Sequence, residues 1–218
     1  GDPIRWTQSL PGVTTGSDGS TAIYVRGGNM GNNLFSVDGV PVYGYTHLLG
    51  LTTVIPQDVI ESVSLKKGGF IGSESNFTSS HLGIETRSPG ADKLKFSTSL
   101  NNFLVSASAE AHVTKDISFM LSGRISPLTY EYRLVKDKLP NLVGDFKDFS
   151  ARVGDLYGKF HWQVGKRSYF EVSGLGSMDS YSFVTPEEMS ETMGWNNAIG
   201  ILRFHSSGKR TVTEVTLS

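Results

Sequence analysis

The chain has 218 residues and no Cys, which excludes disulfides, thiolate metal sites and cysteine nucleophiles. Twenty Lys and Arg balance 21 Asp and Glu, so the net charge of -1 gives no overall attraction to nucleic acid. The 25 Gly, 12 Phe and 8 Tyr with only 19% charged residues favour strands and turns, and no apolar run reaches the roughly 20 residues of a transmembrane helix.

The first 89 residues predict short strands joined by turns, with two short helical pieces. Pro3 followed by Ile4, Trp6 and Leu10 predicts an amphipathic helix that ends before residues 11–12. Apolar runs predict strands at residues 21–26, 34–37, 40–43, 62–66 and 82–87, and residues 56–60 predict one or two helical turns. The Asp38-Gly39 pair predicts a tight hairpin turn between two of these strands.

After Pro89-Gly90 the pattern changes to strict alternation of apolar and polar residues. Alternating segments occur at residues 94–100, 103–113, 117–125, 160–164, 170–172, 199–201 and 215–217. We expect strands of about nine to eleven residues, the length of a tilted strand that crosses a bilayer. We therefore place a domain boundary here, with residues 1–89 in one domain and residues 90–218 in the other.

The connections between the alternating segments differ in length. Residues 114–116, 164–167 and 206–209 predict tight polar turns, whereas residues 128–152 and 178–194 predict long loops. Short turns at one rim and long loops at the other are typical of outer-membrane β-barrels. Alternation alone is equally compatible with a soluble β-sandwich, so that class stays open on periodicity.

Residues 23–87 carry motifs in a characteristic order. Three of them are Ile-Tyr-Val-Arg-Gly-Gly-Asn at residues 23–29, Val-Asp-Gly-Val-Pro-Val-Tyr at 37–43, and Ile-Pro-Gln-Asp-Val-Ile-Glu-Ser-Val at 55–63. Lys-Lys-Gly-Gly-Phe follows at residues 66–70. This succession resembles the plug domain of TonB-dependent receptors, most closely the branch found in Bacteroides-type bacteria. The resemblance covers residues 2–87 well and the later strands only in order and spacing.

The resemblance implies a mainly β fold: a small α+β plug domain without its amino-terminal part, followed by the first antiparallel strands of an incomplete outer-membrane β-barrel. It implies a fragment of a receptor that binds a scarce nutrient and imports it across the cell outer membrane of a Gram-negative bacterium, with the plug gating the barrel. The implied partners are the TonB energy-transducing complex, outer-membrane lipid and an unknown nutrient ligand. The alternative function is a soluble periplasmic or surface β-sandwich binding module.

Five charged residues are expected to hold such a plug in a barrel lumen. This framework is Arg26, Asp38, Asp58, Glu61 and Arg87, with Asp58 and Glu61 as candidate partners of the Arg26 guanidinium. The turns that shape the plug are expected at Gly27, Gly28, Gly39, Pro41, Gly68 and Gly69. Residues 72–80 depart from the family, which usually carries an aromatic-glycine-glycine step here.

No residue pattern predicts an enzyme, a metal site or a cofactor. The five histidines, His47, His81, His112, His161 and His205, lack metal-site spacing and are interpreted as surface, lumen or loop residues. Acidic residues such as Glu187, Glu188 and Asp145 are interpreted as solvated loop charges. We expect the chain to come from a longer precursor, with Gly1 a cleavage scar, and to self-associate through open strand edges.

Overall fold

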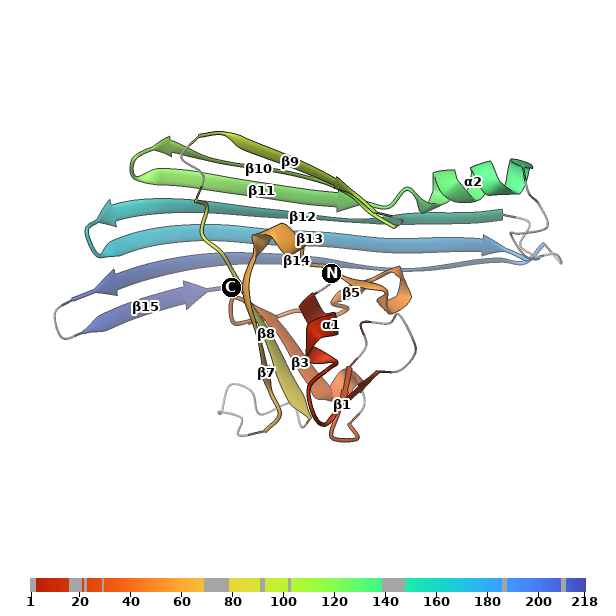
Figure 1. The fold of residues 1–218 in the computed structure, drawn as a ribbon, viewed down its shortest axis with the longest axis horizontal. Helices are drawn as coiled ribbons and strands as arrows, with labels where there is room; N and C mark the ends of the chain where they lie inside the picture. The colour runs from red at the N-terminus through yellow and green to blue at the C-terminus, as the bar shows by residue number, and fades with distance from the viewer. Residues whose placement is uncertain are drawn as a thin grey trace.

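The computed structural model describes residues 3–15, 21, 23–28, 30–68, 79–90, 93–101, 103–138, 148–185, 188–208 and 211–218. Two parts are visible in Figure 1: an N-terminal body (residues 3–90) and a long, curved sheet whose inner face covers it. No helix among the described residues is long and apolar enough to cross a membrane.

Short elements build the N-terminal body. They are α1 (Pro3–Thr7), β1 (Val13–Thr15), β2 (Ile23–Val25), η1 (Met30–Asn32), β3 (Asn33–Val37), β4 (Val40–Pro41), β5 (Thr46–His47), η2 (Leu48–Gly50), β6 (Thr52–Thr53), η3 (Gln57–Val59), β7 (Ile60–Lys66) and β8 (Ser80–Thr86). A four-stranded sheet of order β4-β3-β8-β7 forms the centre, in which β3 and β8 run parallel. β1 pairs with β2 and β5 with β6.

The hairpin predicted at Asp38-Gly39 is confirmed. Val37 pairs with Val40 across the two-residue turn, where Asp38 and Gly39 have φ of 49° and 84°. Asp tolerates this left-handed region and Gly adopts it freely, which is why this pair fits the turn. Pro41 lies in β4 at the edge of the sheet, where its missing N–H breaks no ladder.

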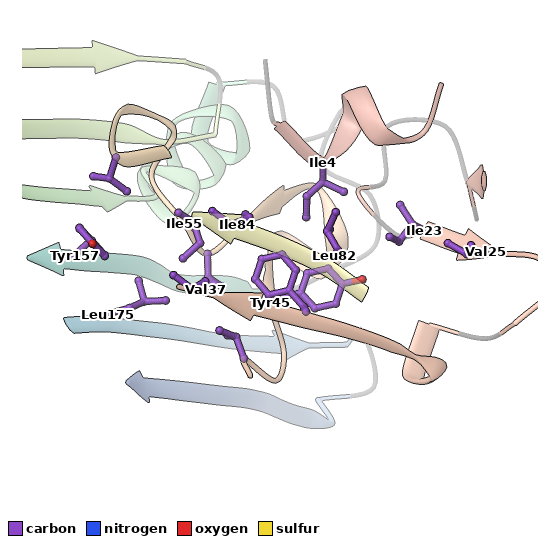
Figure 2. Close-up of a cluster of buried hydrophobic side chains, with 14 of the residues drawn as sticks. Ile4, Ile23, Val25, Val37, Tyr45, Ile55, Leu82, Ile84, Tyr157 and Leu175 are labelled. Carbon is purple, nitrogen blue, oxygen red and sulfur yellow. The ribbon is translucent and has the colours of Figure 1, made fainter. Parts of the chain in front are cut away.

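Apolar side chains from α1 and the central sheet form the main core, shown in Figure 2. Ile55, Leu82 and Ile84 are at most 1% exposed, and each such side chain contributes about 1.5–3 kcal/mol by its burial. Tyr157 and Leu175 of the long sheet pack against this same cluster. The core therefore belongs to the N-terminal body but is closed on one side by the sheet.

Seven strands form the long sheet. They are β9 (Lys95–Leu100), β10 (Val105–Thr114), β11 (Ile117–Ile125), β12 (Asp148–Gly165), β13 (Ser168–Val184), β14 (Ser190–Ser207) and β15 (Val212–Leu217), and helix α2 (Leu128–Lys138) precedes β12. Each strand pairs antiparallel with its neighbour in sequence, in the order β15-β14-β13-β12-β11-β10-β9. The sheet is a meander whose two edges are β9 and β15.

The two faces of the long sheet have reversed polarity compared with a soluble protein. Asp155, Tyr157 and Lys159 of β12 are buried on the inner face, between 1% and 7% exposed. Leu156 and Phe160, which alternate with them, are 55% and 41% exposed on the outer face. The soluble sandwich requires the apolar faces of these strands to pack against each other, so the structure does not favour it.

Two sequence-based expectations for this sheet are wrong. β12, β13 and β14 have 17 or 18 residues rather than nine to eleven, and residues 178–194 form no long loop, because β13 and β14 pair up to Val184 and Ser190. Residues 128–152 contain α2 and the start of β12. The alternation of apolar and polar residues ends before the strands do, because backbone pairing continues through residues that are mostly polar.

Candidate functional site

The candidate site is the contact between the N-terminal body and the inner face of the long sheet. The inner face carries polar side chains that are at most 7% exposed: Glu110, Ser118, Ser122, Arg124, Asp155, Lys159, Glu171, Ser173, Ser177 and Asp179. Buried charges are stable only when they are paired and hydrogen-bonded. Three networks supply most of those partners, and each links a loop or strand end of the N-terminal body to the sheet. Glu171 lies outside them and accepts a separate hydrogen bond from the Ser88 hydroxyl at 2.9 Å.

The His47 network lies where β5 meets β12 and β13. His47 is fully buried, with Nδ1 2.5 Å from Asp179 Oδ2 and Nε2 3.0 Å from Asp155 Oδ2. Asp179 Oδ1 accepts hydrogen bonds from the Leu48 N–H at 3.2 Å and the Tyr181 hydroxyl at 2.6 Å. One imidazole of the N-terminal body is thus held between carboxylates from two neighbouring strands.

Arg124 of β11 completes this network. Its Nη2 lies 2.7 Å and its Nε 2.8 Å from Asp155 Oδ2, and Nη2 also donates to the Thr53 carbonyl at 2.6 Å. With His47 protonated, two cations face two carboxylates and the buried cluster has no net charge. Arg124 therefore stabilises the carboxylate and binds the backbone of β6 at the same time.

The surroundings of His47 favour its positively charged form. Burial by itself lowers the pKa of His47, but the hydrogen bonds to Asp155 and Asp179 and their negative charges outweigh it and raise the pKa above its usual 6.5. Both ring nitrogens face carboxylate oxygens, so both act as donors. The contact is an ion pair as well as a pair of hydrogen bonds.

The Asp38 network holds the β3–β4 hairpin. The Asp38 carboxylate accepts hydrogen bonds from the Thr86 N–H at 2.8 Å and the Thr86 hydroxyl at 2.6 Å, and Lys159 Nζ lies 3.9 Å from it. Lys159 donates to the Thr86 carbonyl at 3.2 Å, and the Tyr157 hydroxyl donates to the Thr86 hydroxyl at 2.8 Å. Arg203 donates to the Asp38 carbonyl at 3.2 Å. Strands β12 and β14 thus both hold this turn.

The Arg87 network holds the end of β8. Arg87 Nη1 lies 2.5 Å from Glu110 Oε2 of β10, and its Nε donates to the Asp58 carbonyl at 2.6 Å. Ser122 of β11 donates to the Asp58 carboxylate at 2.9 Å. Arg87, just after β8, and Asp58, in η3, are therefore fixed to β10 and β11 of the long sheet.

The structure brings together three of the five predicted framework residues at this contact: Asp38, Asp58 and Arg87. Arg26 and Glu61 are exposed, and no ion pair joins Arg26 to Asp58 or Glu61 in the described part of the chain. The expected pairing of Arg26 with those carboxylates is therefore wrong. Arg26 has a φ of 50° and its guanidinium lies beside Gly68.

The predicted turn residues lie at the expected bends where they are described. Gly27, Gly39 and Gly68 all have positive φ. A Cβ at Gly28 would overlap the Ser79 side chain, so this glycine allows two loops to approach closely. Gly69 and most of residues 72–80 lie outside the described residues, as do Asp145 and Glu187.

Sequence reasoning missed the central residue of the site. The interpretation of the five histidines as surface, lumen or loop residues does not single out His47, which is 0% exposed and hydrogen-bonded at both ring nitrogens. Its partners lie 108 and 132 residues further along the chain, so no local motif marks the cluster. One signal was available: Asp155 and Asp179 are acidic residues at positions of β12 and β13 that share the inner face. Among the described residues, no group of three or more side chains is arranged to hold a metal ion.

Comparison with known proteins gives a family match for the N-terminal body. Residues 5–73 match the family model described as TonB-dependent Receptor Plug Domain. A search of the curated proteins finds no match.

Solved structures match nearly the whole chain. The ferric enterobactin receptor PfeA from Pseudomonas aeruginosa is similar over 98% of this chain and 37% of its own length, with 15% identity and a TM-score of 0.62. The siderophore receptor PirA from the same organism is similar over 98% of this chain and 37% of its own length, with 16% identity and a TM-score of 0.55. P. aeruginosa FpvA bound to heterologous pyoverdines is similar over 98% of this chain and 30% of its own length, with 11% identity and a TM-score of 0.65.

The chain thus spans about a third of the length of these receptors. The plug match falls on the N-terminal body, and the fold match extends through the long sheet. Residues 5–73 are thus similar to the plug domain of TonB-dependent receptors, and the chain as a whole has a fold similar to part of such a receptor.

Proposed function

We propose that the intact protein is a TonB-dependent transporter of the cell outer membrane, in which residues 1–89 are the plug and residues 90–218 begin the barrel. The reversed polarity of the long sheet carries this proposal. An outer face of exposed apolar side chains suits lipid, while the buried charges of the inner face suit a polar lumen that contains a plug. The protein acts as a gated receptor, not as an enzyme.

The plug–wall contact supports a gating role. The contact combines the hydrogen bonds and ion pairs of His47 and Arg87 with apolar packing of Met120, Tyr157 and Leu175 on the main core and of Leu48 on Ala151, Val153 and Tyr181. Polar contacts exchange readily with water when a lumen is wet, so the hydrogen-bonded and ion-paired part of the contact can be broken and remade as the plug rearranges. We propose Arg26, Asp38, Asp58, Glu61 and Arg87, together with His47, as the framework that holds the closed state.

The partners follow from this function. We propose that a TonB energy-transducing complex drives the plug, and that the ligand is a large, scarce nutrient, of which the pyoverdines bound by FpvA are one example. The motif at residues 37–43 supports assignment to the Bacteroides-type branch. Strands β9 and β15 are exposed along their whole length, which supports self-association of the isolated chain through these edges. Light scattering that gives a stable monomer would contradict self-association.

A disulfide lock tests the gate without knowledge of the ligand. The chain has no Cys, and the Ser122 hydroxyl lies 2.9 Å from the Asp58 carboxylate, so Asp58→Cys with Ser122→Cys places two thiols across the contact. Urea in the bath should open conductance through the intact protein in a planar bilayer, because it loosens the plug. The oxidised double variant should stay closed until a reductant is added. Each single variant is the matched control.

Two outcomes would overturn the proposal. One is that the intact protein fails to fractionate with outer membranes. The other is that urea-induced conductance is the same in the oxidised and reduced double variant, because the plug would then not be the element that closes the pore.

A further inference from the structure

The outer face of the long sheet is hollowed where glycines replace side chains. Gly154 pairs with Met178, and Leu156 pairs with Gly176 on the next strand. A shallow hollow of about 420 Å³ lies over these residues and is walled by Ile125, Leu156 and Met178. No atom lies within 4 Å of a Cβ built at Gly176, so the hollow is open to the outside.

A second hollow of about 510 Å³ adjoins the first under helix α2. It shares Ile125, Gly154 and Met178 with the first hollow and is completed by Tyr130 and Arg133 of α2 and Arg152 of β12. The helix is fixed there because the Thr129 hydroxyl bonds both the N–H and the carbonyl of Ala151. The two hollows form one groove, with an apolar end on the strands and a cationic end at the helix.

The two arginines give the groove its charge. Both are exposed, and neither has an ion-pair partner among the residues that the structure describes. Two guanidiniums beside one hollow can bind a phosphate with several charge-assisted hydrogen bonds. A purely apolar ligand would leave that end of the groove unused.

The position of Arg152 along the membrane normal fits that of a lipid headgroup. The rings of Trp162, Phe170 and Phe204 lie next to one another on the outer face close to the tight turns, as in an interfacial aromatic girdle. Arg152 lies ten residues before Trp162 on β12, about 33 Å along the strand or about 25 Å along the normal of a membrane crossed at a tilt near 40°. That height equals the apolar band of outer-membrane barrels. Arg152 therefore lies at the opposite interface, on the side of the longer connections.

We propose that this groove binds a phosphate-bearing lipid of the outer leaflet, with an acyl chain over Gly154 and Gly176 and the phosphate between Arg133 and Arg152. The inference rests on the proposed function, since it requires the outer face to meet the membrane. The apolar and cationic ends lie in the order that such a lipid presents them, from the bilayer centre to the headgroup.

Lipid binding to the intact protein in nonionic detergent tests the proposal, with lipid A carrying both phosphates as the probe and dephosphorylated lipid A as its control. The phosphorylated probe should raise the melting temperature. In the Arg133→Gln/Arg152→Gln variant its affinity should fall about tenfold or more. Arg167→Gln, which removes a charge at a tight turn on the opposite rim, should bind as the parent does. Gly176→Leu fills the groove without a charge change and should also weaken binding.

Equal binding of the phosphorylated and dephosphorylated probes, or equal binding by the double-arginine variant and the parent, would overturn the inference. Strand circular dichroism of each variant separates lost binding from lost folding. Outer-membrane fractionation of the parent separates the two proposals. A parent that inserts but binds no phosphorylated lipid contradicts only the proposed lipid site in the groove, whereas a parent that does not insert contradicts the proposed function.

Discussion

His47 Nε2 lies 3.0 Å from Asp155 Oδ2, and both side chains are fully buried although 108 residues separate them in the chain. Asp179 bonds the other ring nitrogen at 2.5 Å. The N-terminal body is therefore joined to two strands of the long sheet by the single His47 side chain. Because the ions are shielded from water, removal of one partner leaves the others without compensation.

Replacement of His47 by Leu should release the plug. The change keeps most of the side-chain volume but leaves Asp179 without its cation, at a cost of about 3–5 kcal/mol to the free energy of unfolding. Thermal unfolding and limited proteolysis of the intact protein measure the effect. The matched control is His112→Leu on the exposed part of β10, which should change stability by about 0.5 kcal/mol or less. Addition of Asp179→Asn to His47→Leu should recover part of the loss, and no recovery would contradict the ion pair.

Docking of the plug should weaken at alkaline pH. The pKa of His47 is raised above 6.5 in the folded protein, mainly because Asp155 and Asp179 outweigh the effect of burial. A raised pKa contributes stability that is fully present below pH 6.5 and is lost as the pH rises through the folded value. Protease protection of the plug should therefore decline with rising pH in the parent, and this decline should be absent in His47→Leu. The same profile in both proteins would exclude His47 as the titrating group.

Arg87 and Arg26 should differ in their effect on plug release. Arg87 lies 2.5 Å from Glu110 and is partly buried, so Arg87→Ala should increase protease sensitivity of the plug clearly. Arg26→Ala should also increase the protease sensitivity of the plug, since Arg26 is proposed for the framework. The increase should be smaller than for Arg87→Ala, because the Arg26 guanidinium lies beside Gly68 and away from the wall. Unchanged protection in Arg26→Ala would remove Arg26 from the framework and leave Arg87 in it.

The Tyr45 hydroxyl should be dispensable. Tyr45 stacks on Phe35 with ring centroids 4.5 Å apart, and its hydroxyl is buried without a hydrogen-bond partner among the described residues. Burial raises the pKa of Tyr45 to about 12, so the ring stays neutral at all moderate pH values. Tyr45→Phe should raise the free energy of unfolding by about 1 kcal/mol, because a buried group without a partner is removed. A melting temperature below that of the parent would show that the hydroxyl has a partner.

Local chemistry made part of this fold predictable. The Asp38-Gly39 turn follows from the need for positive φ at both positions, and Pro41 follows from its place on an edge. Alternation over residues 105–125 likewise predicts two paired strands, because one face contacts a different environment from the other.

The rest depended on contacts that a single sequence does not display. β13 continues through Ser180 and Ser182, which pair with Gly194 and Thr192 by backbone hydrogen bonds that any residue can make. Because these side chains are polar, the sequence predicts a loop at residues 178–194 instead of a strand. The His47 network required knowledge that β12 and β13 place Asp155 and Asp179 beside the η2 turn, and that arrangement is set by strand register rather than by any local motif.

The central claim is that the long sheet is a lipid-facing wall around a plug. The accessibility of the residues along β12 to lipid and to water tests this claim most directly. Single Cys residues at positions 152–164 of the intact, otherwise Cys-free protein can each carry a spin label, whose exposure to oxygen and to a water-soluble nickel chelate is then measured in membranes. The account predicts a period of two, with labels at Leu156, Phe160 and Trp162 exposed to oxygen but not to the chelate, and labels at Tyr157 and Lys159 shielded from both. Equal exposure of both faces to the chelate would contradict a lipid-facing wall around a plug.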